Sequence, residues 1–352
     1  MKRIFYVIVV LSLVFVGCKQ KDSNEVEIGA ILPLTGYFSF NGQCCKEGLD
    51  LAIQEINNSQ SKYKFTIIYE DNHSLTKDGI MSYKKFRTQD VKYLIGFGGQ
   101  LQSGFISETN NQNLILFAHA ANNTEFMSLT NRCLRFYPTT EIFAHIITDF
   151  WEKSSITTVG VVYLQNDAFT KLGEAVRSES IAKGYTVSLF EGYDPNSRDY
   201  KDIVNKAANK NIQCIYVAGS SETAASFIHQ LFSNPKTNNI AVIGEMSLAS
   251  SSNRELIGEI KAPIYLVDNN ISDEFLNKYY NAYKKTPNAY AAYAYANMYI
   301  LLDALNNIDD KSDINSIYKF IRKNKFETVI GEISFDKNTG EPNFELIVHE
   351  LK

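Results

Sequence analysis

The feature that most constrains the fold is a repeated alternation of short apolar strands with amphipathic helices. A strand is expected at residues 26–32, and a helix at residues 43–57 follows, with apolar or small residues at i, i+3, i+4, i+7, i+8 and i+11. Further strands are expected at 65–69, 93–95, 114–117, 158–163, 186–190, 214–217, 240–243 and 264–267. Helices are expected between most of them, at 76–86, 142–151, 169–182, 200–208 and 222–232.

This alternation predicts an α/β fold whose parallel sheets are covered by helices on both faces. Roughly ten strands exceed one ordinary open sheet, and 352 residues exceed one ordinary domain, so two lobes are expected. From residue 272 to 323 the pattern is helical without an intervening strand. Last strands at 328–335 and 344–351 are then free to return to either lobe.

The N-terminus has the pattern of an export signal. Met1-Lys2-Arg3 precedes an apolar run at residues 4–16, which is too short to span a bilayer and is typical of a secretory signal peptide. Val16-Gly17-Cys18 resembles a bacterial lipobox, so Cys18 is expected to be lipid-modified as the first mature residue, with 1–17 as signal peptide and 18–25 as tether. The alternative is an uncleaved membrane anchor. Either places the chain in the cell envelope, on the periplasmic or extracellular face of a bacterial membrane.

Charge and motifs argue against nucleic-acid binding and against catalysis. The formal net charge is −4, and no basic block is present. The histidines lack metal-ligand spacing, GxSxG and P-loop motifs are absent, and Leu101 stands where a GxGxxG fingerprint needs glycine. His119, just after a predicted strand, either lines a pocket or makes a loop hydrogen bond. We expect no enzyme activity, no cofactor and no metal.

We expect the cysteines after Cys18 to have a structural role. Cys45 falls on the buried face of the helix at 43–57, and Cys44 lies about 100° round it. An exported protein permits a disulfide among Cys44, Cys45, Cys133 and Cys214, and free buried thiols are the alternative.

Several motifs, in order, resemble a known family. Pro33-Leu34-Thr35-Gly36, followed by Gly42, Gly48, Ala52 and Glu55-Ile56-Asn57, resembles the opening of the branched-chain amino-acid type of periplasmic binding protein, the solute receptors of one class of ABC importer. The resemblance continues to about residue 350 through Tyr69-Glu70-Asp71-Asn72, Tyr93-Leu94-Ile95-Gly96, Phe136-Tyr137-Pro138, 159–163, Asp199-Tyr200, 290–305 and 329–336. It implies two Rossmann-like lobes joined by three crossovers, which close on a ligand like a clamshell. The expected lobes are 26–138 with 270–329, and 139–269 with 330–352.

Ligands of open α/β sheets bind beyond the carboxyl ends of the strands. Gly98-Gly99-Gln100 lies at such an end, before a helix expected near 103–111 whose N-terminus favours an anion. The resemblance implies that Gln100, in place of the family's serine, binds the ligand carboxylate, and that Ala121 and Asn122 hold an amino-acid head group. It also implies that Glu245 pairs with the ligand ammonium; the alternative for Glu245 is a solvated loop charge.

Further residues complete the expected ligand site. Phe169 lies one place after a family tyrosine, and Ser220 and Ser221 replace a family aromatic. Tyr37 and Phe40 are expected either to line the part of the site that surrounds the ligand side chain or to pack in the core.

The resemblance therefore implies a monomeric, lipid-anchored receptor that binds a small solute, an amino acid or similar carboxylate, and delivers it to a membrane permease. A sensory module that signals to a partner protein is the first alternative, and an extracytoplasmic enzyme is the second.

Overall fold

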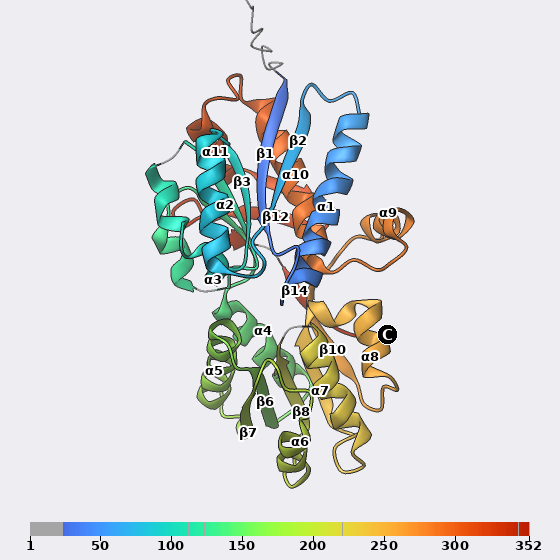
Figure 1. The fold of residues 1–352 in the computed structure, drawn as a ribbon. Helices are drawn as coiled ribbons and strands as arrows, with labels where there is room; N and C mark the ends of the chain where they lie inside the picture. Colours follow the sequence, from blue (N-terminus) through green and yellow to red (C-terminus); the bar gives the residue numbers. More distant parts are fainter. Residues whose placement is uncertain (1–23, 112, 123, 220, 344, 352) are drawn as a thin grey trace, which may run out of the picture.

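The computed structural model describes residues 24–351 except 112, 123, 220 and 344, and these residues form two stacked lobes (Figure 1). Cys18 and the predicted signal peptide lie outside the described residues. The first lobe is built on a parallel sheet in the order β2-β1-β3-β4-β5. Its strands are β1 (Glu25–Leu32), β2 (Lys64–Asp71), β3 (Tyr93–Phe97), β4 (Ile115–His119) and β5 (Cys133–Phe136).

The second lobe is built on a six-stranded sheet in the order β14-β10-β9-β8-β6-β7. It is parallel except for β14, which pairs antiparallel with β10. The strands are β6 (Thr158–Leu164), β7 (Thr186–Tyr193), β8 (Cys214–Ala218), β9 (Ala241–Glu245), β10 (Ile264–Asn269) and β14 (Leu346–Glu350). The predicted α/β fold with two lobes and mainly parallel sheets is confirmed.

Helices cover the sheets of both lobes. The first lobe carries α1 (Ser39–Asn58), α2 (Thr76–Thr88), α3 (Gly99–Gln102), α9 (Asp273–Tyr283), α10 (Ala289–Asn307) and α11 (Ile314–Lys323), with 3-10 turns η1 (Ile106–Asn111) and η2 (Thr124–Leu129). The second carries α4 (Thr140–Lys153), α5 (Asp167–Ala182), α6 (Lys201–Ala208), α7 (Ser221–Ser233) and α8 (Ser251–Ile257), with η3 (Met246–Ala249). Among the described residues, no helix combines the length and apolar character that crossing a bilayer requires.

Helix α10 is buried along most of its length and packs against α1. Gly48 of α1 makes the close approach possible, because a Cβ there would lie 2.1 Å from the carbonyl oxygen of Ala291. Cys44 is buried as well as Cys45, because α9 covers that side of α1. The four cysteines of the described part, Cys44, Cys45, Cys133 and Cys214, are free thiols, so the free-thiol alternative is the one observed.

Two local expectations were wrong. The helix expected near 103–111 is replaced by the short α3 and the 3-10 turn η1. The single strand expected at 328–335 is an antiparallel hairpin of β11 (Lys325–Thr328) and β12 (Gly331–Phe335), because Gly331 turns the chain with a φ of 85°.

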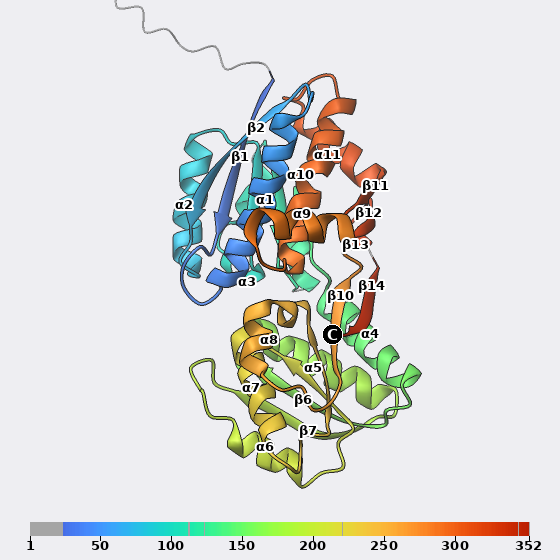
Figure 2. The ribbon, with the colours of Figure 1, turned by 90° about the vertical axis from the view of Figure 1, so that its right-hand side faces the viewer.

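The hairpin continues into β13 (Pro342–Asn343) and contacts α11 and β5, so it lies with the first lobe. The sequence analysis expected the chain to return to the second lobe at residue 330. In the structure, the chain joins the second-lobe sheet only at β14. Figure 2 shows that β10, β14 and α4 lie at the same side of the junction between the lobes. The chain passes between the lobes at β5–α4, β10–α9 and β13–β14.

Candidate functional site

A cavity of about 200 Å³ lies between the lobes. It opens where strands of both parallel sheets end, which is the edge at which α/β proteins bind ligands. The first lobe contributes the loops after β1, β3 and β4, and the second contributes the loop after β6 and the start of α5. The lining residues are Phe38, Asn41, Phe97, Gly98, Gly99, Gln100, Leu101, Ser103, Ala120, Asn122, Phe126, Leu129, Tyr137, Thr140, Asn166, Asp167, Ala168, Phe169, Lys171 and Tyr290.

The cavity brings together Gly99, Gln100, Asn122 and Phe169, which the sequence analysis singled out. Four other predicted site residues lie outside this lining: Ala121, Tyr37, Phe40 and Glu245. Ala121 is buried in the core of the first lobe, and Tyr37 is 43% exposed outside the lining and lies edge-on to Phe38.

Phe40 is half-buried and packs against the core. Ser220 lies outside the described residues, and Ser221 is described only as the first residue of α7. Glu245 is buried and lies outside the cavity lining.

Backbone hydrogen bonds hold the loop after β3 against the end of β4. Gly98 has a φ of 76°, a conformation that favours glycine, and its N–H donates to the carbonyl of His119 at 2.9 Å. The N–H of Gly99 donates to the carbonyl of Ala120 at 3.2 Å. Both of these amides are used within the protein and α3 has only four residues, so the anion site expected at this helix N-terminus stays a prediction.

Gln100 presents an exposed side chain to the cavity while its backbone is fixed. Its carbonyl accepts hydrogen bonds from the hydroxyl of Thr76 at 3.2 Å and from that of Ser103 at 2.7 Å. The carbonyl of Asn122 accepts from both the N–H and the hydroxyl of Thr140 at the start of α4. These two hydrogen bonds join the loop after β4 to the start of α4 at the junction of the lobes. The carbonyl of Asn122 is therefore already used within the protein.

The second-lobe wall of the cavity is the first turn of α5. The side chain of Asn166 caps this helix by accepting from the N–H of Phe169 at 2.9 Å, which holds the backbone of Phe169 at the cavity wall. Asp167 and Lys171 form an ion pair at 3.5 Å on the same turn. The sequence analysis missed these three residues, although an Asn-Asp pair before an amphipathic run is an N-cap signature.

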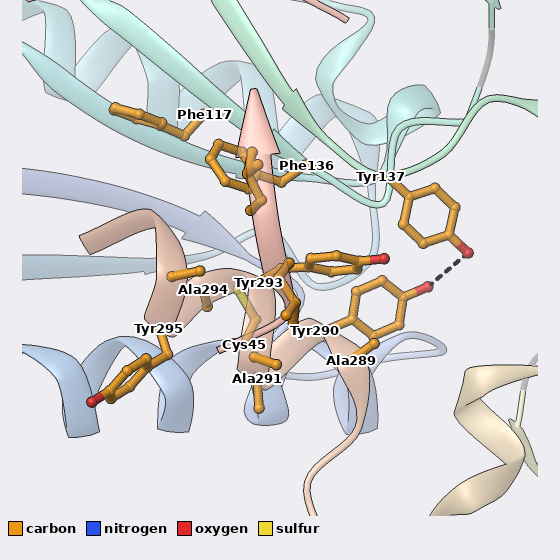
Figure 3. Packing of buried hydrophobic residues seen from close by; sticks show 14 of the residues in the cluster. Cys45, Phe117, Phe136, Tyr137, Ala289, Tyr290, Ala291, Tyr293, Ala294 and Tyr295 are labelled. Carbon is orange, nitrogen blue, oxygen red and sulfur yellow. Dashed lines mark hydrogen bonds between the residues drawn. The ribbon is translucent and has the colours of Figure 1, made fainter. Parts of the chain in front are cut away.

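A chain of hydroxyl groups connects the lobes beside the cavity. The hydroxyl of Tyr290, on α10, donates to the hydroxyl of Tyr137, in the β5–α4 connection, at 3.4 Å (Figure 3). Tyr137 in turn donates to Oε2 of Glu245 at 3.3 Å, and Tyr216 of β8 donates to Oε1 at 3.5 Å. Burial raises the pKa of Glu245 to about 8, although both phenol hydrogen bonds oppose this. Sequence reasoning did not identify Tyr137 or Tyr290 as site residues.

His119 does not line the cavity. It lies on β4 with its ring buried against Phe136, at 5.5 Å between ring centroids, and its Nε2 is 3.4 Å from the side-chain nitrogen of Asn297. Burial lowers the pKa of His119 to about 3, so the ring is neutral at physiological pH. Within the described part of the chain, no group of three or more His, Cys, Asp or Glu side chains could hold a metal ion.

Comparison with known proteins agrees with this geometry. The family model described as "Periplasmic binding protein" matches residues 25–352. Leu/Ile/Val-binding protein homolog 2 of Brucella abortus (strain 2308) is 25% identical over 357 residues, covering 97% of this chain and 94% of the relative.

Solved structures share the fold. The substrate-binding protein LivJ from Streptococcus pneumoniae, in complex with isoleucine, superposes with a TM-score of 0.77 at 18% identity over 93% of this chain and 99% of its own. A solute-binding protein of an ABC transporter from Rhodopseudomonas palustris BisB5, in complex with 3,4-dihydroxy benzoic acid, has a TM-score of 0.83 at 16% identity, covering 93% of each chain.

Proposed function

The chain belongs to the branched-chain amino-acid type of the periplasmic binding protein family, and from this premise we propose that it is the extracytoplasmic receptor of an ABC importer for an amino acid or a similar small carboxylate. The observation that carries the proposal is the cavity between the lobes, lined from both of them. A solute held there contacts both lobes, so its binding free energy favours the closed arrangement.

The size and lining of the cavity indicate the kind of solute. About 200 Å³ is below the usual range for drug-sized ligands and suits a small molecule. Its wall includes several aromatic residues, and Phe38, Phe97, Phe126, Phe169 and Tyr290 offer an apolar surface for the solute side chain. Amide side chains of Gln100 and Asn122 can donate to a carboxylate, and the names of the Brucella relative and the LivJ structure support an amino acid.

Closure would move residues 24–138 with 270–343 against residues 139–269 with 345–351, about the three chain connections. The loops carrying Gln100 and Asn122 would capture the solute first, and Phe169, Asp167 and Lys171 would then approach it from α5. A buried polar group on the solute must find a partner in the protein, which provides selectivity. The closed shape is what a membrane permease would recognise.

We also propose that Cys18 carries the lipid anchor and that the mature protein is a monomer held at the membrane surface. The support is the lipobox-like sequence Val16-Gly17-Cys18. Mass spectrometry of the mature N-terminus tests this, and a chain that begins elsewhere than at a lipidated Cys18 would contradict it.

The test of function is calorimetric titration of the purified protein with the standard L-amino acids, benzoate and other small carboxylates, after removal of bound ligand by partial unfolding. Saturable one-to-one binding of at least one amino acid is expected, with a decrease in the radius of gyration by X-ray scattering. Mass spectrometry of the molecule that co-purifies identifies the solute independently. If no amino acid and no carboxylate binds, the proposal is rejected.

A further inference from the structure

The second-lobe wall of the cavity carries two opposite charges at the start of α5. Among the described residues that line the cavity, Asp167 and Lys171 are the charged ones. They are four positions apart on the helix, so their side chains share one face, and Oδ2 of Asp167 lies 3.5 Å from Nζ of Lys171. The two side chains are 60% and 51% exposed, respectively, so both charged groups are open to solvent in this arrangement of the lobes.

The first-lobe wall faces them with neutral groups. Among the described lining residues of this lobe, the polar side chains are amides and hydroxyls, and the amides of Gln100 and Asn122 are those proposed above to bind the solute carboxylate. The aromatic rings of Phe38, Phe97 and Phe126 lie in the same wall and suit the apolar stem of a solute. A solute that spans the cavity with its carboxylate on this lobe therefore presents its opposite end to α5.

Closure of the lobes would bring Asp167 and Lys171 against that end of the solute and remove water from both side chains. An apolar solute end would leave both charges desolvated without a new partner, which is costly. The attraction between the two charges does not remove this cost, because the desolvation penalty of an ion pair can exceed its Coulombic gain. A wholly aliphatic solute end is therefore disfavoured at this wall.

A charged solute end suits the pair no better. Because Asp167 and Lys171 lie within 3.5 Å of each other, a solute charge close to one is close to the other, and attraction and repulsion largely cancel. A neutral group that both donates and accepts hydrogen bonds satisfies the two side chains together. A carboxamide and a hydroxyl group have both functions.

We propose that Asp167 and Lys171 are specificity-determining residues, which select a solute whose end opposite the carboxylate is a neutral carboxamide or hydroxyl group. In the closed protein this group donates to the carboxylate of Asp167 and accepts from the ammonium group of Lys171. The inference rests on the proposed function and narrows the solute to an amino acid or carboxylate of this kind. Branched aliphatic amino acids, which the name of the Brucella relative mentions, are then poor solutes for this chain.

Calorimetric titration with solutes of similar size and different side-chain polarity tests the inference. In the wild type, L-asparagine should bind more tightly than L-leucine, and L-glutamine more tightly than L-methionine, by roughly 10- to 100-fold, the usual effect of a hydrogen bond to a charged group. L-aspartate and L-lysine should also bind more weakly than L-asparagine. The double variant Asp167→Ala/Lys171→Met lacks both charges, so its preference for the amide should disappear.

A second ion pair of the same lobe provides the matched control. Asp199→Ala/Lys201→Met removes an exposed pair of the same residue types, also 3.5 Å apart, that lies outside the cavity lining. This control should keep the wild-type preference. If Asp167→Ala/Lys171→Met does not fold, the ranking of the solutes by the wild type decides.

The outcomes separate this inference from the proposed function. Equal or tighter binding of leucine, isoleucine or valine, tighter binding of aspartate or lysine, or an unchanged preference in the cavity variant overturns the inference and leaves the receptor function intact. If carboxylates bind and amino acids do not, 4-hydroxybenzoate should bind more tightly than 4-methylbenzoate, and any other order overturns the inference. Failure of every amino acid and every carboxylate to bind rejects both the inference and the proposed function.

Discussion

Tyr137 and Tyr290 stack face to face, with ring centroids 5.7 Å apart and an angle of 9° between the rings, where the two lobes meet. Both rings are buried and both line the cavity. Tyr290 belongs to the first lobe, and Tyr137 belongs to a segment through which the chain enters the second. The stacked pair therefore connects the cavity with the junction between the lobes, and the predictions below concern this region and the residues that support it.

Replacing Phe169 by Ala should weaken solute binding by about 10- to 100-fold with little change in thermal stability. The ring is half-buried at the cavity wall, and the loss of a largely buried aromatic contact costs on the order of 1.5–3 kcal/mol. Calorimetry with the identified solute measures the effect. Phe169→Leu retains most of the apolar surface and should bind nearly as well as the wild type; equal binding by Phe169→Ala would exclude contact with the solute.

Asn166→Ala should destabilise the second lobe by about 1 kcal/mol, because the N–H of Phe169 loses its capping acceptor. Urea denaturation measures the change. Asn166→Asp preserves an acceptor at the same place and should remain close to the wild type. If both variants are equally destabilised, the cap is not the reason.

The stability of the empty protein should fall, relative to Glu245→Gln, as the pH rises from about 5 to 9. The pKa of Glu245 is raised from 4.5 to about 8, so the folded state binds more protons than the unfolded state between these values. Stability falls with rising pH wherever the folded state binds more protons, and each unit of the difference corresponds to about 1.4 kcal/mol. Denaturation curves across this pH range provide the measurement, and parallel pH profiles for the two proteins would contradict it.

Asp71→Ala should destabilise the first lobe by roughly 1.5–3 kcal/mol at pH 7. The carboxylate accepts from the N–H groups of Leu34, Thr35 and His73 and from the hydroxyl of Thr35, and so holds the loop after β1. Burial opposes ionisation, but these hydrogen bonds outweigh it and lower the pKa of Asp71 below 3.8.

The contribution of Asp71 is therefore present above the unfolded-state pKa and disappears as the pH falls through the folded-state value. The difference in stability between wild type and variant should shrink in acid. Asp309→Ala, at an exposed position, should be neutral and serves as the control.

Cys44, Cys45, Cys133 and Cys214 should resist alkylation in the native protein and react after denaturation. All four are buried, and burial raises the pKa of each thiol, to about 11 for Cys44 and about 12 for Cys214. Peptide mapping by mass spectrometry follows each cysteine separately. A reducing agent should leave the melting temperature unchanged; a clear decrease would reveal a disulfide.

The motifs that resembled the family turned out to support one another in space. Thr35, from the first motif, donates to Asp71, from the second, across 36 residues, and Gly48 lets α10 approach α1. Because these motifs contact one another in the structure, their order along the sequence could predict the fold. The strand β5 was missed because it is four residues long and includes Arg135, a charge that the fold buries beside Glu341.

Within the site, the resemblance pointed to Gln100, Asn122 and Phe169, and all three line the cavity. For Gln100 the position just after a predicted strand was an independent argument. Tyr37 and Phe40 were expected either to line the ligand site or to pack in the core, and neither lines the cavity: Phe40 packs against the core and Tyr37 lies edge-on to Phe38.

The sequence by itself determined the alternation of strands and helices, and with it two mainly parallel sheets and the edge at which the cavity opens, because periodicity depends on neighbouring residues. Only the tertiary structure decided that Tyr290 meets Tyr137 across 153 residues and that Tyr137 meets Glu245 across 108. These contacts depend on where the chain crosses between lobes and on how deeply α10 is packed. Burial of the Glu245 carboxyl group among phenols, and hence its proton affinity, arises from that assembly and has no signature in the local pattern.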